Sequence, residues 1–324
     1  MAFAKFITFS KRMTRFLILS LLFLVSFEGF AQKPKLVIPV GHTNMATSVS
    51  INPSGNLIAS SEGANMVKIW DIEIRKELYT LPGHQEAVTT MAFHPVANFL
   101  ASGSNDKSII VWDLKKAQKR TVLNGHSDAV LKVKYSKDGL SIISSSADGS
   151  IRVWDANTGT LNNEIKIGLP VHCFGLSEGE DYLVAGTRTG AIFLIDYRGG
   201  KVLHQLAPGT QAINDIHFSQ DGRKIIAADN LGKLYVINST SAELIRTISA
   251  FDLRARQLEF VDKLDHVIAI GRDSKKNIRF FDIGTGEELN KDVEIISSTH
   301  PNFSFGTILN GAVKGLKSSA NRKL

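Results

Sequence analysis

The sequence predicts an all-β fold built from repeated four-stranded antiparallel sheets, and three observations support this prediction. Gly-His pairs recur at residues 41–42, 83–84 and 125–126, and Trp-Asp pairs at 70–71, 112–113 and 154–155, which is a period of 42 residues. Within each period the apolar residues alternate with polar ones, as they do in strands. Turn-forming sequences such as Asp-Gly and Asn-Thr-Gly separate the alternating runs.

The third period illustrates the expected elements. Strands are predicted at 130–135, 142–146, 151–154 and 163–167, with turns at 136–139, 147–149 and 157–159 between them. One such sheet cannot bury both of its faces, so neighbouring sheets must stack. Helical solenoids also repeat at about 40 residues, but they require apolar residues at helical spacing, which these β-branched runs lack.

The combination of Gly-His, Asp-Gly and Trp-Asp resembles the WD40 repeat, whose units form the blades of a β-propeller. The resemblance is clearest in the units that begin at 41, 83 and 125, and it fades afterwards while the period holds. Ile195-Asp196, Ile237-Asn238 and Phe281-Asp282 stand where Trp-Asp is expected. The propeller is predicted at 32–311, with repeats near 41–82, 83–124, 125–166, 167–207, 208–249 and 250–292.

The resemblance implies that a His, a Ser or Thr, an Asp and the Trp form a hydrogen-bonded chain across a blade. The positions that match are His42 and Trp70, then His84, Asp106 and Trp112, and then His126, Asp148 and Trp154. The serine is Ser102 or Ser104 in the second unit and Ser144 or Ser146 in the third. The first unit has Ala64 at the Asp position. Units four to six lack both His and Trp, and we expect them to rest on apolar packing alone.

Closure of the ring remains open between three alternatives. Residues 35–40 precede the first Gly-His as an outer strand of a last blade does. Residues 303–309 and 312–316 offer two weak strands for that blade. We favour six clear repeats plus a degenerate or incomplete seventh; the other possibilities are a six-bladed ring and a chain shortened from a longer parent.

The N-terminus has the pattern of a signal peptide. Residues 1–31 contain four basic residues and then an uncharged run at 16–27, with small residues placed for cleavage before Gln32. The run is shorter than the roughly 20 residues of a spanning helix, so no permanent membrane anchor is expected. We therefore expect the mature chain to be exported to the periplasm or outside the cell, and a signal peptide without a pair of cysteines suits a bacterium.

Charge and composition exclude several classes of function. The chain has a net charge of +7, but residues 32–311 carry none once the signal peptide and a basic tail at 312–324 are set aside. Nucleic-acid binding, which needs a basic face, is therefore not expected. A single cysteine, Cys173, excludes an internal disulfide and a cysteine-rich zinc site. Because strand neighbours point to opposite faces, Cys173 and His172 do not suit a catalytic dyad.

The same reasoning predicts that the chain is not an enzyme. No nucleotide-binding glycine loop and no metal-ligand set occurs in the sequence, so neither a cofactor nor a small-molecule substrate is expected. His and Asp recur once in each of two units, as a structural device does, whereas an active site is built once. The alternative of a propeller enzyme with a hydrolase site in its channel is disfavoured, because no carboxylate recurs at equivalent positions of the inner strands.

The family resemblance implies a non-catalytic scaffold that presents its loops to a protein or peptide partner. The alternative is a repeat or regulatory domain separated from an exported hydrolase, for example a caspase-like one. The loop residues expected to face a partner are Asn44, Glu86, Asp128, Asn105 and Lys107. Glu86 and Asp128 make the predicted surface acidic and the partner basic.

Overall fold

The computed structural model describes residues 46–62, 65–260, 265–274 and 277–289. The chain divides into units 1–41 and 42–324, and every described residue belongs to the second. The expected signal peptide, the degenerate seventh blade, the basic tail, His42, Asn44 and Ala64 all lie outside the described residues. In the described part every regular element is a β-strand, so the all-β prediction is confirmed. No helix able to cross a membrane occurs among these residues.

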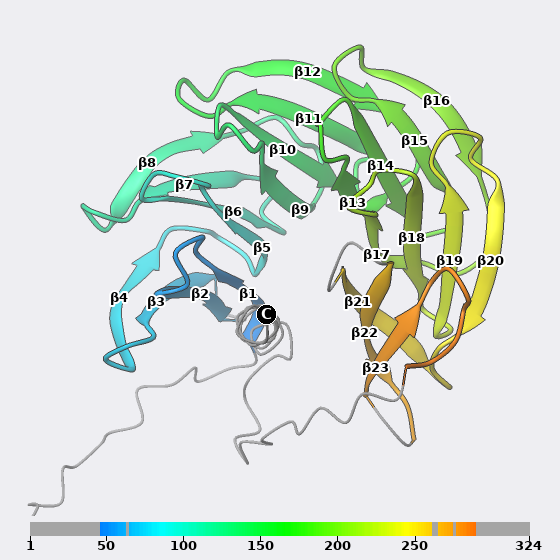
Figure 1. Cartoon of the computed structure of the whole chain (residues 1–324). Coiled ribbons are helices and arrows are strands. Elements are labelled where there is room, and N and C mark those ends of the chain that lie inside the picture. The colour runs from blue at the N-terminus through cyan, green and yellow to red at the C-terminus, as the bar shows by residue number, and fades with distance from the viewer. Residues whose placement is uncertain (1–45, 63–64, 261–264, 275–276, 290–324) are drawn as a thin grey trace, which may run out of the picture. The chain divides into compact units, whose positions relative to one another are not determined.

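The described strands form six antiparallel sheets in which each strand pairs with its neighbours in sequence (Figure 1). The first three sheets consist of β1 (Ala46–Ile51), β2 (Leu57–Glu62), β3 (Met66–Asp71) and β4 (Lys76–Pro82); β5 (Val88–Phe93), β6 (Phe99–Ser104), β7 (Ile109–Asp113) and β8 (Gln118–Leu123); and β9 (Val130–Tyr135), β10 (Ser141–Ser146), β11 (Ser150–Asp155) and β12 (Leu161–Lys166).

The next three sheets consist of β13 (Val171–Leu176), β14 (Tyr182–Thr187), β15 (Ile192–Asp196) and β16 (Lys201–Leu206); β17 (Ile213–Phe218), β18 (Lys224–Asp229), β19 (Lys233–Asn238) and β20 (Leu244–Ser249); and β21 (Arg254–Phe260), β22 (His266–Arg272) and β23 (Ile278–Asp282). The sixth sheet thus has three strands within the described residues. The four strands predicted in the third period are confirmed as β9 to β12.

The Asp of each Trp-Asp pair ends its strand by forming the following turn. Asp113 Oδ1 accepts the backbone N–H groups of Lys115 and Lys116 at 2.9 and 3.1 Å. Asn238 forms the same turn in the fifth sheet with the N–H groups of Thr240 and Ser241. Short polar side chains favour such turns because they satisfy backbone donors locally. The Asp or Asn therefore persists in units that have lost the Trp.

Apolar clusters join each sheet to the next. Five of them combine buried residues from sheets 1 and 2, 2 and 3, 3 and 4, 4 and 5, and 5 and 6. Trp112, for example, belongs to the cluster that includes Ile69 of the preceding sheet. Burial of an aliphatic or aromatic side chain contributes about 1.5–3 kcal/mol, so stacking, rather than strand pairing alone, holds the sheets together.

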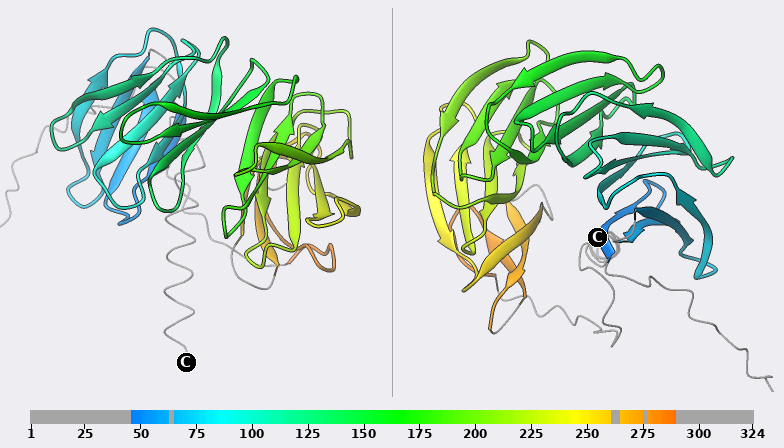
Figure 2. Two further views of the ribbon diagram at one scale, coloured as in Figure 1. Left: turned by 90° about the horizontal axis from the view of Figure 1, so that it is seen from above. Right: turned by 180° about the vertical axis from the view of Figure 1, so that it is seen from behind.

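The first strand of each sheet is the innermost, and side chains connect neighbouring inner strands. Thr47 Oγ1 donates to the carbonyl of Val88, Thr89 Oγ1 to that of Val130, and Asn214 Nδ2 to that of Ala255. The sheets accordingly lie beside one another in sequence order, as the right-hand view of Figure 2 shows. Strands β1, β5, β9, β17 and β21 contribute lining residues to one central cavity of about 750 Å³, which we call the channel.

Candidate functional site

The second sheet brings together the four residues of one buried chain of hydrogen bonds. His84 lies in the loop between β4 and β5, Ser102 on β6, Asp106 in the β6–β7 turn and Trp112 on β7. Ser102 Oγ lies 2.8 Å from both Trp112 Nε1 and His84 Nε2, and His84 Nδ1 lies 2.9 Å from Asp106 Oδ2. The sequence left Ser102 and Ser104 as alternatives; Ser102 is the residue that joins His to Trp.

With a neutral His84 ring beside the Asp106 carboxylate, which can only accept, the donors and acceptors in this chain fit one arrangement of protons. The indole N–H of Trp112 can only donate, so Ser102 Oγ accepts from it and donates its own proton to His84 Nε2. His84 Nδ1 then carries the ring proton and donates it to Asp106. Burial lowers the pKa of His84 although the bond to Asp106 opposes the shift, in agreement with a neutral ring.

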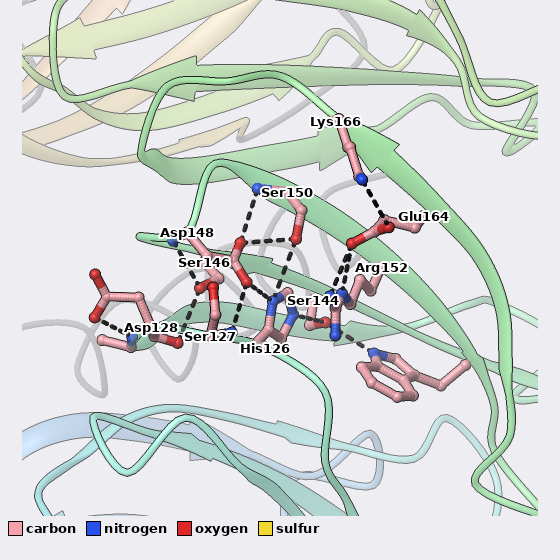
Figure 3. Close-up of polar contacts among 12 residues, drawn as sticks. His126, Ser127, Asp128, Ser144, Ser146, Asp148, Ser150, Arg152, Glu164 and Lys166 are labelled. Atoms are coloured by element: carbon pink, nitrogen blue, oxygen red, sulfur yellow. Dashed lines mark hydrogen bonds and ion pairs between the residues drawn. The ribbon is translucent and has the colours of Figure 1, made fainter.

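The third sheet repeats the arrangement 42 residues later in the sequence (Figure 3). Trp154 Nε1 and His126 Nε2 lie 2.9 and 2.8 Å from Ser144 Oγ, and His126 Nδ1 lies 2.8 Å from Asp148 Oδ2. Burial likewise lowers the pKa of His126. Burial alone would raise the pKa of Asp148, but hydrogen bonds from Ser150 and His126 lower it to about 2.

These Ser-His-Asp groups do not have the exposure that catalysis needs. Ser102 and Ser144 are fully buried, and each hydroxyl is engaged by both an indole and an imidazole. A serine nucleophile must instead meet a substrate carbonyl beside an oxyanion site. The arrangement therefore acts as a structural network.

The same network also holds the exposed loops in front of it. Asp106 Oδ2 accepts the backbone N–H of Gln85 at 2.8 Å, and Asp148 Oδ2 accepts that of Ser127 at 3.0 Å. Ser104 Oγ donates to the carbonyl of Glu86 at 3.0 Å. Ser146 Oγ donates in the same way to that of Asp128 at 3.0 Å. Both serine alternatives are thus used, one for the buried chain and one for the loop.

The residues predicted to face a partner lie at this end of the second and third sheets. Glu86 and Asp128 are exposed in the loops that the networks hold, and we call this pair the acidic rim. Asn105 and Lys107 are exposed in the adjoining β6–β7 turn, which is tied to the loop by the hydrogen bond from Asn105 N to the Ala87 carbonyl. Asn44 lies outside the described residues.

The first sheet contains part of the same network. Trp70 Nε1 donates to Ser60 Oγ at 2.6 Å, as Trp112 does to Ser102. Its predicted histidine, His42, lies outside the described residues.

The expectation that units four to six rest on apolar packing alone is wrong for the fifth sheet. Asp229, which is buried, accepts a hydrogen bond from Tyr235 Oη at 2.9 Å and also caps the N–H groups of Leu231 and Lys233. Burial and the bond to Asp229 raise the pKa of Tyr235. Asp229 occupies the register of Ser104 and Ser146, at the end of the second strand. A different pair of residue types therefore stabilises the same turn.

The channel contains a charged cluster that the sequence pattern did not identify. Lys132 of β9 reaches Asp215 of β17, with Nζ 2.8 Å from Oδ1, although 83 residues separate them. Asp215 is buried, and its Oδ2 also lies 3.0 Å from His217 Nε2 and accepts the backbone N–H of Leu258 at 3.1 Å. Burial alone would raise the pKa of Asp215, but His217 and Lys132 lower it on balance.

This cluster connects three sheets through the channel. Sheets 3, 5 and 6 contribute Lys132, Asp215 and Leu258 respectively. Nothing in the repeat pattern distinguishes Asp215 from the other aspartates of the sequence. The available signal was its register, because Asp215 and Lys132 occupy the same position on their inner strands relative to the strand that follows.

The structure disfavours two other kinds of site in the described residues, a reactive thiol and a metal centre. Cys173 is buried on β13, and its burial raises the pKa of the thiol to about 12, so the reactive thiolate is disfavoured. His172 is only partly buried, as expected for the opposite face of the strand. No group of three or more His, Cys, Asp or Glu suited to a metal ion occurs in the part of the chain that the structure describes.

Comparison with known protein families agrees with the first half of this architecture. Residues 33–71, 75–113 and 117–155 match the WD40 family, described as "WD domain, G-beta repeat". Each match ends at the Asp of a Trp-Asp pair. No curated protein matches the chain. Residues 33–155 therefore consist of three consecutive WD40 repeats, and the six antiparallel sheets of the described residues are consistent with the blades that such repeats form.

Proposed function

We propose that this protein is a non-catalytic interaction scaffold that binds a protein or peptide partner at the acidic rim. One observation carries the proposal: Glu86 and Asp128 are exposed, yet the loops that bear them are hydrogen-bonded to buried groups. A loop that is ordered before binding loses less conformational entropy when a partner docks. The WD40 fold agrees with such a role, although a fold alone does not determine function.

The charges at this end of the sheets suggest the chemistry of the partner. Glu86 and Asp128 favour a positively charged segment, because complementary charge speeds association and selects the partner. Asn105 and Lys107 add an amide and a cation next to the rim. We therefore expect a basic peptide that also offers hydrogen-bonding groups, and neither nucleic acid nor an acidic peptide.

Selection from a random peptide library displayed on phage tests this proposal, with the full-length protein as bait. We expect enrichment of peptides rich in Lys and Arg, and Glu86→Lys/Asp128→Lys should weaken their binding at least about tenfold, which corresponds to 1.4 kcal/mol. The matched control is Glu73→Lys/Glu287→Lys, which reverses two exposed acids in turns at the opposite end of the sheets. Equal binding by the wild type and the rim variant would refute the acidic rim.

We also propose that the chain is exported and that residues 1–31 are removed. The basic residues, the apolar run at 16–27 and the small residues before Gln32 support this proposal. The mature protein recovered from a secreting bacterial host should begin at Gln32, as mass spectrometry of its N-terminal peptide can determine. An intact N-terminus on protein found in the cytoplasm would contradict it.

A further inference from the structure

On the first strand of every sheet, one residue occupies the equivalent position in the pairing with the second strand. The paired positions are Ser50 with Ala59, Ala92 with Ala101, Lys134 with Ile143, Gly175 with Val184, His217 with Ile226 and Glu259 with Ile268. We call the first members of these pairs the channel layer. Five of the six line the channel; the exception is Gly175.

Two members of the channel layer carry charges that form no ion pair within the described residues. Lys134 on β9 and Glu259 on β21 are half-buried, and neither makes an ion pair or side-chain hydrogen bond with another described residue. The preceding layer differs, because its Lys132 and Asp215 pair with each other. A partly buried charge without a partner is unfavourable, so the channel layer holds a cation and an anion that a ligand can satisfy.

The channel has space for such a ligand between these charges. Ser50 and Ala92 line the channel and have small side chains. Gly175 has no side chain, and a Cβ added there would lie 2.8 Å from the carbonyl oxygen of Ile216, because β13 packs closely against β17. The channel volume of about 750 Å³ falls within the range of small-molecule sites, which is about 300–1,000 Å³. Asn214 and Gln257 add side-chain amides to its wall.

The two charges select the class of ligand. A simple anion would be attracted by Lys134 but repelled by Glu259. A simple cation would be attracted by Glu259 but repelled by Lys134. A molecule with a carboxylate at one end and an ammonium at the other gains both contacts. We propose that the channel binds a zwitterion of the amino-acid or short-peptide class, with its carboxylate at Lys134 and its ammonium at Glu259.

The electrostatics around Lys134 support this orientation. Burial and the neighbouring charge of Lys132 lower the pKa of Lys134 to about 8, although Asp215 and Glu259 oppose the shift. The negative charge of a ligand carboxylate would further stabilise the protonated amine. Other titratable groups that line the cavity already have a partner or are exposed to solvent. His217 contacts Asp215, Lys137 contacts Glu178, and Arg256 is exposed. This site is separate from the acidic rim and does not depend on the proposed function.

Calorimetry of the full-length protein with L-alanine and with alanine peptides of two, three and four residues tests the proposal. We expect one length to bind most tightly at millimolar concentration, because the ligand must span the two charges. The N-acetylated and C-amidated forms of that length should bind at least about tenfold more weakly, since each lacks one charge. No binding by any length, or equal binding of blocked and free forms, would overturn the proposal.

Variants distinguish recognition from a structural effect. Lys134→Met should abolish the preference for a free carboxylate, and Glu259→Gln the preference for a free ammonium. The charge swap Lys134→Glu/Glu259→Lys should restore binding, because the ligand can then bind in the reverse orientation. Circular dichroism checks that this variant is folded. If the folded variant does not bind the peptides, the proposal is overturned. Glu86→Lys/Asp128→Lys should bind the alanine peptides as the wild type does, which keeps this test independent of the rim.

Discussion

The serine hydroxyl at the centre of each network shows how one buried polar atom can be indispensable. Ser144 Oγ accepts from Trp154 and donates to His126, so its removal leaves two buried groups without a partner. Ser145, the next residue on β10, is equally buried, but its hydroxyl has no hydrogen-bond partner. The two serines therefore form a natural comparison at a single place in the fold.

We predict that Ser144→Ala lowers the free energy of unfolding by about 1–3 kcal/mol, which is the usual cost of stranding buried polar groups. Ser145→Ala should leave stability unchanged or raise it, because it removes an unsatisfied hydroxyl. Denaturant titration followed by tryptophan fluorescence measures both variants. Equal losses for the two substitutions would show that the network does not stabilise the sheet.

Protonation of the buried histidines should make stability depend on pH. Burial lowers the pKa of His84 and His126, so both rings bind protons more readily in the unfolded chain. Stability is then greatest above the unfolded-state pKa of about 6.5 and falls as the pH drops below it. His94 and His172, whose pKa values burial also lowers, act in the same direction.

The aspartates add a second loss at more acidic pH. The pKa of Asp148 is lowered to about 2, so its contribution is present above about pH 4 and disappears as the pH falls toward 2. Unfolding free energies measured from pH 8 to pH 3 should decline in two stages. The double variant His84→Gln/His126→Gln should show a smaller first stage, and a wild-type stability that is constant between pH 8 and 5 would contradict the assignment of neutral rings.

At the scale of the element, the turns follow local chemistry and could be predicted from sequence. The turn after β9 places Gly139 at a positive φ of 74°, and Ser136 and Leu140 both donate to Asp138 Oδ1. The turn after β17 repeats this arrangement with Asp221 and with Gly222 at 72°. Such turns need only neighbouring residues, which is why Ser-Lys-Asp-Gly could be recognised without a structure.

Lys107 departs from the pattern of its turn. Its φ is 72°, whereas glycine takes the corresponding positive φ in the third, fourth and fifth sheets, with 82° at Gly149, 86° at Gly190 and 79° at Gly232. A residue with a Cβ pays about 1–2 kcal/mol for this left-handed conformation. The turn therefore holds strain that its sequence equivalents avoid.

We expect Lys107→Gly to raise the free energy of unfolding by about 1 kcal/mol, because the relief of strain exceeds the added freedom of the unfolded chain. The reciprocal change Gly149→Lys should be destabilising, because it creates the same strain in the third sheet. Thermal melts of the two variants beside the wild type provide the measurement. If Lys107→Gly instead destabilises the protein, the lysine side chain stabilises the fold by more than its strained backbone destabilises it.

The networks were predictable in part, for a physical reason. His84, Asp106 and Trp112 keep a constant spacing with His126, Asp148 and Trp154, so repetition revealed them. The choice between Ser102 and Ser104 depends on which strand position faces the indole, and only the structure settles that choice. The Asp229–Tyr235 bond uses other residue types at other spacings, so the repeat contains no trace of it.

At the scale of the whole described unit, the sequence predicted the stacking of sheets but not the contents of the channel. Periodicity shows that units follow one another, whereas a contact between sheets 3 and 5 depends on the angle between successive sheets. Lys132 and Asp215 lie 83 residues apart and meet only because their inner strands converge. Their ion pair is therefore the most specific consequence of the arrangement.

A double-mutant cycle on Lys132→Met and Asp215→Asn tests this convergence most directly. Lys132→Met alone should cost about 3–5 kcal/mol of unfolding free energy, because it leaves a buried carboxylate without its lysine. The double variant should lose clearly less than the sum of the single variants, with a coupling energy of about 1–3 kcal/mol. Additive losses, within about 0.5 kcal/mol, would mean that sheets 3 and 5 do not meet in a common channel.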